Sequence, residues 1–215
     1  MSSALFTVEV PVSLDKASLS VARYADDDEA LRQSALGAGL WSEATRRFRS
    51  PSRRREWVAS RLLLKQMGIG PGQVAHLPSG KPVLEDSDFH LSISHTQGYV
   101  AAMWSHRPCG IDVERFSPRV LRVRERFVDD ALLRPDIEGD ELIWTLLLCW
   151  SAKETIYKCM DEQGVDFRAQ LHVLPFSLQQ SGELQACETR TERRQRFTVG
   201  YYRGEDFVLT YTVGA

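Results

Sequence analysis

Hydrophobic and polar residues alternate along several short stretches of the chain, and this alternation predicts β-strands. The first stretch is residues 4–12. Three more, "FHLSISH", "YVAAMWS" and "CGIDVE", follow one another closely enough to predict a three-stranded meander. Alternation returns near the C-terminus in "LHVLPFSL", "ELQACE", "RFTVGYY" and "FVLTYTV". The pattern therefore predicts antiparallel strands in both halves of the chain.

Other stretches have the apolar spacing and the end signals of helices. A helix is predicted at residues 51–67, with Ser50 as its cap, Pro51 in its first turn and Gly68 as its stop. Its apolar residues share one side, which leaves an arginine-rich outer side. A long helix is expected at residues 140–160, which contain the apolar run "LIWTLLLCW". Shorter helices are expected in "DDDEALRQSAL" and "SPRVLRVRERFVDDALL".

Helices combined with antiparallel strands in each half predict the α+β class. The 215 residues suit one large domain or two small ones, and the sequence has no internal repeat or long linker. We expect an N-terminal subdomain at residues 1–108 and a C-terminal subdomain at residues 109–215.

The overall charge points to no polyanionic partner. The formal net charge is -2, from 27 basic and 29 acidic residues, so we expect neither nucleic acid nor a membrane as partner. The N-terminus lacks the pattern of a secretory signal, and no apolar run reaches the roughly 20 residues of a membrane span, so we expect a cytoplasmic protein. The 4 cysteines are expected to be reduced and mostly buried.

Two carboxylates lie two residues apart in the predicted strand "CGIDVERF". Asp112 and Glu114 share one face of that strand, with Cα atoms about 7 Å apart, close enough for both side chains to reach one ion. A divalent cation bound by oxygen ligands would relieve their repulsion. The alternative is a half-buried strand with a solvated acidic face.

A third carboxylate comes from the long predicted helix. Trp150, Glu154 and Lys158 are spaced i, i+4 and i+8 and therefore line one helix face, which places an acid beside a base. The same spacing is also that of an ordinary stabilising helix pair.

Further basic residues occupy a turn, a strand end and a helix. Lys81 lies between Gly80 and Pro82 in a compact turn that can direct an ammonium group at a phosphate, and His95 ends a predicted strand. Taken alone, each is better explained by an ordinary surface turn or strand end. Arginines gather at positions 46, 47, 49, 53, 54, 55 and 61. Such a cluster could bind nucleic acid, a phosphorylated ligand or an acidic protein, and the alternative is a solvated face.

Taken in order, "GKPVL", "LSISHTQG", "GIDVE" and "WSAKETIYK" resemble the signature of the 4′-phosphopantetheinyl transferases, specifically the monomeric surfactin-synthetase-activating type. The resemblance is sharp between residues 80 and 158. It implies two similar α+β subdomains related by a pseudo-twofold axis, with coenzyme A between them. It also implies Mg²⁺-dependent transfer of phosphopantetheine from coenzyme A to a serine of an apo acyl or peptidyl carrier protein, with release of adenosine 3′,5′-bisphosphate.

The resemblance assigns the acidic residues to a metal site. It implies that Asp112, Glu114 and Glu154 hold Mg²⁺ on the pyrophosphate of coenzyme A and that Lys158 contacts the neighbouring phosphates. Glu154 is also the expected base for the serine hydroxyl, directly or through water.

The same resemblance implies a nucleotide grip. Lys81 and His95 would bind phosphates of coenzyme A, with the ribose 3′-phosphate as the contact of His95 and Ser94 beside it. Arginines of the helix after residue 50 would complete this grip. Arg61 is the first choice, and Arg54 represents the three consecutive arginines.

Lys153 matches the lysine before the glutamate of the motif, so it is expected either to orient the acidic site or to contact coenzyme A. The sequence departs from the family pattern after "ERF", where many relatives carry a further glutamate and this chain offers only Asp129 and Asp130. Val113, between the two acids, cannot be a metal ligand. Where some relatives have a polar residue here, we expect a water to occupy the corresponding coordination position of the metal.

Carrier proteins are acidic helical bundles, so the resemblance makes the arginines of "SPRVLRVRERF" a candidate dock, with a solvated helix face as the alternative. The carriers of fatty-acid, polyketide and nonribosomal-peptide synthesis are all candidates. Two rival functions are a coenzyme A-binding scaffold without transfer and a Mg²⁺-dependent hydrolase of phosphorylated small molecules.

Overall fold

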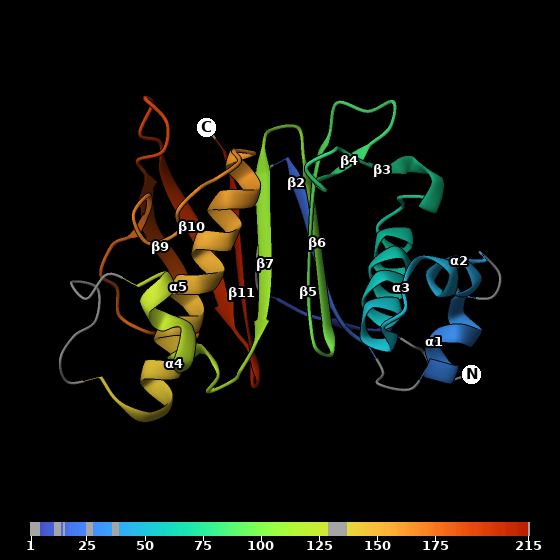
Figure 1. The fold of residues 1–215 in the computed structure, drawn as a ribbon, viewed down its shortest axis with the longest axis horizontal. Coiled ribbons are helices and arrows are strands. Elements are labelled where there is room, and N and C mark those ends of the chain that lie inside the picture. The colour runs from blue at the N-terminus through green and yellow to red at the C-terminus, as the bar shows by residue number, and fades with distance from the viewer. Residues whose placement is uncertain are drawn as a thin grey trace. The chain divides into compact units, whose positions relative to one another are not determined.

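The structure is a computed structural model, and it describes residues 5–10, 14, 16–24, 28–35, 39–128 and 137–214. The chain divides into two compact units, Met1–His106 and Arg107–Ala215. Each unit combines helices with antiparallel strands, so the α+β class is confirmed (Figure 1).

The first unit is built on a sheet with the strand order β1-β2-β6-β5. Its strands are β1 (Leu5–Val8), β2 (Ala17–Tyr24), β5 (His90–Thr96) and β6 (Tyr99–Ser105). A separate short hairpin pairs β3 (Val74–His76) with β4 (Pro82–Leu84), after the 3-10 turn η2 (Pro71–Gln73). The helices are α1 (Asp28–Ala35), α2 (Leu40–Arg47) and α3 (Pro51–Gln66).

Helix α3 begins at Pro51, as the capping pattern predicts, and ends at Gln66, one residue before the predicted end. Pro51 occupies its first turn, where a missing N–H is tolerated, and Gly68 adopts a positive φ of 84° just after its end. Val58, Leu63 and Leu64 of this helix are buried in the core of the first unit. Burial of this apolar side holds α3 on the sheet. The predicted arginine-rich outer side is only partly present, because Arg53 is exposed and Arg54 and Arg55 are half-buried, whereas Arg61 is buried.

The predicted three-stranded meander is wrong. Strands β5 and β6 pair with each other, but the third expected strand, β7 (Cys109–Arg115), pairs with β11 (Phe207–Val213) of the second unit. The free edge of β6 is taken by β2, a strand that the sequence analysis missed. Because β2 satisfies the backbone groups along that edge of β6, no place remains there for β7.

The second unit contains a sheet with the order β7-β11-β10-β9-β8, and all of its strands were predicted. The remaining strands are β8 (Leu171–Val173), β9 (Ser181–Glu188) and β10 (Arg196–Arg203). The helices are α4 (Val120–Val123) and α5 (Gly139–Met160), with the 3-10 turn η3 (Arg124–Arg126) after α4. Asp129 and Asp130 lie outside the described residues.

Helix α5 packs on β7 and β11 through two local features (Figure 1). At Gly110, a Cβ atom would lie only 2.0 Å from the carbonyl oxygen of Thr155, so the helix backbone approaches the strand as only glycine permits. Beside it, the hydroxyl of Thr210 on β11 bonds those of Ser151 and Thr155 at 2.8 and 2.6 Å, and all three residues are buried. These contacts set the rotation and height of α5 on the sheet.

All four cysteines are free thiols, and Cys109, Cys149 and Cys159 are buried, as predicted. Burial raises the pKa of the Cys149 thiol to about 12. Among the described helices, none combines the length and the apolar character needed to cross a membrane.

We expect Gly110→Ala to destabilise the second unit by about 1 to 3 kcal/mol, because the added methyl group overlaps the Thr155 carbonyl and forces α5 away from β7. Urea unfolding measures this loss. Gly72→Ala is the matched control, since a Cβ at Gly72 meets nothing within 4 Å. A loss no larger in Gly110→Ala than in Gly72→Ala would contradict the close approach.

Candidate functional site

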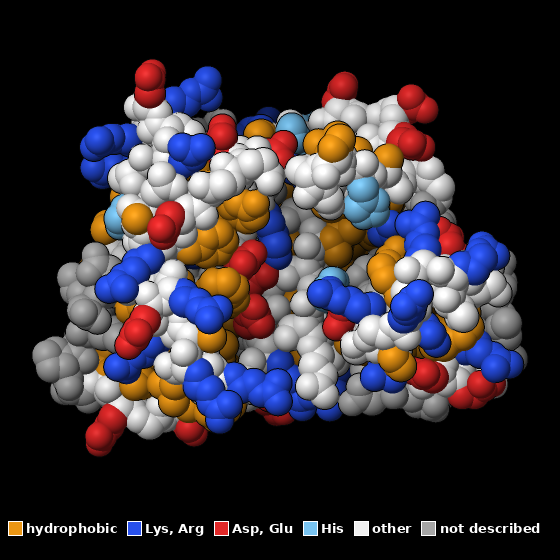
Figure 2. Space-filling model, viewed as in Figure 1, with side chains coloured by type: hydrophobic (Ala, Val, Ile, Leu, Met, Phe, Trp, Pro, Cys, Tyr) orange, Lys and Arg blue, Asp and Glu red, His pale blue; other side chains and the backbone are white. Residues whose placement is uncertain are grey.

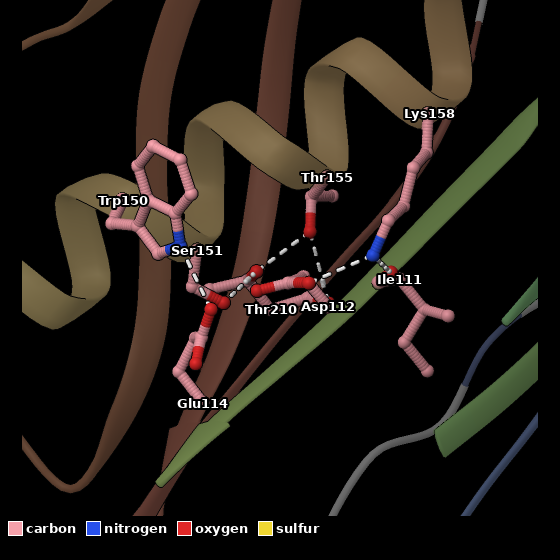
Figure 3. A network of polar contacts seen from close by, with 8 residues as sticks. All are labelled: Ile111, Asp112, Glu114, Trp150, Ser151, Thr155, Lys158 and Thr210. Atoms are coloured by element: carbon pink, nitrogen blue, oxygen red, sulfur yellow. Dashed lines mark hydrogen bonds and ion pairs between the residues drawn. The ribbon is translucent and has the colours of Figure 1, made fainter. Parts of the chain in front are cut away.

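Two groups of predicted site residues are found in the structure, one in each unit. In the second unit, β7 and α5 bring together Asp112, Glu114, Glu154 and Lys158, as Figure 3 shows for the residues that it draws. Alternation along β7 places both acids on one face, as predicted, and α5 packs against this strand. Figure 2 shows acidic side chains at the surface where α5 and β7 lie in Figure 1.

Lys158 is the cation of this group. Its Nζ donates to the carboxylate Oδ1 of Asp112 at 2.7 Å and to the carbonyl oxygen of Ile111 at 3.1 Å (Figure 3). Asp112 is buried, with 3% of its surface exposed, so the ion pair stands in a medium of low polarity. The lysine therefore compensates one carboxylate and leaves the charges of the two glutamates.

Burial and this surplus of negative charge raise the pKa values of the two glutamates. Burial first, and the neighbouring Asp112 second, raise the pKa of Glu114 to about 7. The same two causes raise the pKa of Glu154, and Lys158 counteracts them. The site thus holds acidic groups that a cation would stabilise.

Trp150 has a second role besides packing. Its indole Nε1 donates to Oε1 of Glu114 at 2.7 Å, which fixes that carboxylate (Figure 3). Its ring packs between Phe127, at a centroid distance of 5.2 Å, and Phe167, at 5.5 Å. The sequence analysis placed Trp150 on the helix face of Glu154 but gave it no role in the acidic site.

Lys153 lies inside the protein, with 2% of its surface exposed. Its Nζ donates to the carbonyl oxygens of Phe127 at 2.5 Å and Phe167 at 2.7 Å. These contacts favour the expectation that Lys153 orients the site. They give no support to a contact with coenzyme A.

The first unit contains a cavity of about 210 Å³ that brings Arg61 and His95 together. Its walls also include apolar side chains and the turn around Lys81. The lining residues are Phe48, Arg53, Glu56, Trp57, Ser60, Arg61, His76, Gly80, Pro82, Ile93 and His95. Of these, Glu56, Trp57 and His76 were missed, although residues 53, 56, 57, 60 and 61 share one side of a helix.

Arg61 is a buried cation, with 4% of its surface exposed. Its guanidinium lies over the ring of Trp57, with the Cζ atom 5.1 Å from the centroid, and Arg47 approaches the same ring at 5.6 Å. Burial and Arg47 lower the pKa of Arg61, yet an arginine stays charged at neutral pH. An anion entering the cavity would therefore meet a desolvated cation.

Three predicted nucleotide contacts do not line this cavity. Arg54 donates to the carbonyl oxygens of Phe48 and Arg49 at 2.9 and 3.1 Å, which ties the end of α2 to α3. Ser94 is buried in β5, and Lys81 is half-buried between two residues that do line the cavity. Their contacts with coenzyme A stay predictions.

Residues 108–212 match a family model described as "4'-phosphopantetheinyl transferase superfamily". The chain is also similar to the 4'-phosphopantetheinyl transferase Sfp of Bacillus subtilis (strain 168), at 30% identity over 111 residues, which is 49% of this chain and 47% of that protein. It is 30% identical to the 4'-phosphopantetheinyl transferase psf-1 of Bacillus pumilus over 41% of this chain and 39% of that protein. The chain thus spans about half the length, or less, of these curated relatives.

We expect the metal-free protein to lose stability as the pH rises from about 4.5 to about 7. The folded state holds the Glu114 proton more tightly than the unfolded state, so the penalty is absent below the ordinary pKa and complete above the raised one. The loss is on the order of 3 kcal/mol for a shift of this size, and Glu154 adds in the same direction.

Urea unfolding in EDTA across this pH range tests the effect. Glu114→Gln keeps the acceptor oxygen for Trp150 and should flatten the pH dependence, whereas Glu162→Gln, at an exposed position after α5, should not. Equal slopes for wild type and Glu114→Gln would show that the Glu114 charge is not penalised.

Proposed function

Since the chain belongs, through residues 108–212, to the 4′-phosphopantetheinyl transferase superfamily, we propose that it transfers phosphopantetheine from coenzyme A to a serine of an apo acyl or peptidyl carrier protein. The chain is homologous to enzymes of this family. The observation that carries the proposal is the acidic group of β7 and α5, in which Lys158 and Trp150 hold two carboxylates beside Glu154.

The donor set of this group fits Mg²⁺. Carboxylate oxygens are its preferred protein ligands, and it commonly takes one or two of them together with water and substrate phosphates. Within the described ranges, no group of three acidic, histidine or cysteine side chains is placed so that it could hold a metal ion by itself. Asp112, Glu114 and Glu154 would hold the ion. When bound, Mg²⁺ would neutralise charge on the pyrophosphate.

The residues of the chain would then bind and move a proton. The serine oxygen of the carrier forms a bond to the phosphorus that bears pantetheine, and the bond from that phosphorus to the bridging oxygen breaks. Adenosine 3′,5′-bisphosphate leaves with the electron pair. Glu154, whose pKa is raised by burial and by Asp112, is the proposed acceptor of the serine proton. Lys158 would contact the phosphates from its position on Asp112.

The cavity of the first unit supports a nucleotide site. Its apolar walls, formed by Phe48, Trp57 and Ile93, suit a base, and Arg61 and His95 suit the ribose 3′-phosphate. The turn that carries Lys81 contributes Gly80 and Pro82 to the same wall. We therefore assign the nucleotide end of coenzyme A to this cavity.

The segment around α4 is the proposed dock for the carrier protein. Figure 2 shows lysine or arginine side chains around the position of α4, with hydrophobic ones among them. Leu121 and Val123 are exposed, at 36% and 38%. The exposed arginines of this surface are Arg119, Arg122, Arg124, Arg126 and Arg168. An acidic helical carrier would complement this charge. We further propose that the protein is a cytoplasmic monomer and that it acts on carriers of fatty-acid, polyketide or nonribosomal-peptide synthesis. The pseudo-twofold relation between the two subdomains stays a prediction.

We expect intact-protein mass spectrometry to detect the mass gain of one phosphopantetheine on an apo carrier protein incubated with this protein, coenzyme A and Mg²⁺. Asp112→Ala and Glu154→Ala should each abolish the gain, because the first removes a metal ligand and the partner of Lys158, and the second removes the base. EDTA should abolish it as well.

Two other outcomes would change the proposal. Coenzyme A binding without any mass gain on several unrelated carriers would favour the scaffold, and breakdown of coenzyme A without a carrier would favour the hydrolase. Near-normal transfer in both alanine variants would contradict the three-carboxylate site.

Metal binding is expected to stabilise the fold independently of turnover. At a Mg²⁺ concentration 100 times the dissociation constant, one site that binds only the folded state adds about 2.7 kcal/mol. Differential scanning fluorimetry with and without Mg²⁺ measures the shift. Glu154→Gln should reduce this shift, whereas Glu162→Gln should leave it unchanged. An unaltered shift in Glu154→Gln would place the ion elsewhere.

A further inference from the structure

One carboxylate stands among the cations of the first-unit cavity. Oε2 of Glu56, on α3, lies 3.5 Å from Nδ1 of His95 on β5 and 3.4 Å from Nη1 of Arg53. The Glu56 side chain is 16% exposed, against 62% for Arg53 and 35% for His95. By itself, a carboxylate in this place would repel a phosphate. It can still favour phosphate binding if it keeps a neighbouring histidine protonated.

The charges around the cavity suggest what that change is. The titratable residues on its wall are Arg53, Glu56 and Arg61 from α3, His76 from β3 and His95 from β5. Burial, Arg61 and Arg47 lower the pKa of His76, which favours its neutral form. With a protonated His95, three cations and one carboxylate leave two positive charges, which match the dianion of a phosphate monoester. With a neutral His95, only one positive charge remains.

We propose that Glu56 is a positioning residue that keeps His95 protonated and turns its Nε2 side to the phosphate monoester. A carboxylate on one ring nitrogen stabilises the imidazolium and fixes which nitrogen serves the other partner. The inference rests on the proposed function for the identity of the ligand, because the ribose 3′-phosphate of coenzyme A is the monoester that His95 would bind.

The contact with Arg53 does not explain Glu56 by itself. Arg53 and Glu56 are an i,i+3 pair on α3, and Arg53 is largely exposed, so solvent screens the pair and it contributes little to stability. The contact with His95 is different, because it joins α3 to β5 across 39 positions of sequence and because both residues line the cavity.

Glu56→Gln tests the role, with two measurements on the full chain. NMR titration of histidine-labelled protein reads the pKa of His95 without any ligand, and the variant should lower it by about one unit, a tenfold change in proton affinity. Calorimetry then compares coenzyme A with dephospho-coenzyme A, which lacks the 3′-phosphate. Coenzyme A should bind about tenfold more weakly in the variant near pH 8 and nearly as in wild type near pH 6, while dephospho-coenzyme A should be unaffected.

Two further variants isolate the path through His95. Glu29→Gln is the matched control, because Glu29 on α1 is in an exposed i,i+3 pair with Arg32 at 3.7 Å and does not line the cavity, so neither measurement should change. In a His95→Gln background, Glu56→Gln should no longer weaken coenzyme A binding.

The outcomes separate this inference from the proposed function. An unchanged His95 pKa, or tighter coenzyme A binding in Glu56→Gln, would overturn the role of Glu56. If the wild type binds no coenzyme A, or binds both ligands equally, then the nucleotide site fails and the phosphate part of the inference fails with it. The His95 titration would still report whether Glu56 and His95 are coupled.

Discussion

The close approach of α5 to β7 at Gly110 is the constraint on which the acidic site depends. A side chain at that position would push the helix outward, and Trp150, Glu154 and Lys158 would move away from the strand that carries their partners. The buried hydroxyls of Ser151, Thr155 and Thr210 act in the same direction, because they bond only at one height of the helix on the sheet. The packing of α5 on the sheet therefore determines where the side chains of the acidic site lie.

Each unit gathers side chains of like charge and places one residue of the opposite charge among them. The second unit places Lys158 among acids, and the first unit places Glu56 among cations. In each case the compensation is incomplete, which leaves negative charge around Glu114 and Glu154 and positive charge around Arg61. A surplus of buried charge destabilises the protein when no ligand is bound. The same surplus favours binding of a ligand of opposite charge.

The sequence predicted what depends on local patterns. Helices α3 and α5, the strands of the second unit and the shared face of Asp112 and Glu114 all follow from short-range periodicity and end signals. The pairing of β7 with β11 did not, because strand partners far apart in sequence leave no local trace, and the missed strand β2 was needed to exclude the meander. Glu56 was overlooked because its meaning comes from His95, which lies on another element.

The hydrogen bond from Trp150 to Glu114 gives the acidic site a built-in optical reporter. An indole that donates to a carboxylate senses the charge on that group, so its emission responds when the carboxylate is protonated or shared with a cation. The other four tryptophans lie at positions 41, 57, 104 and 144. The intrinsic fluorescence of Trp150 is thus tied to the charge state of Glu114 without any label.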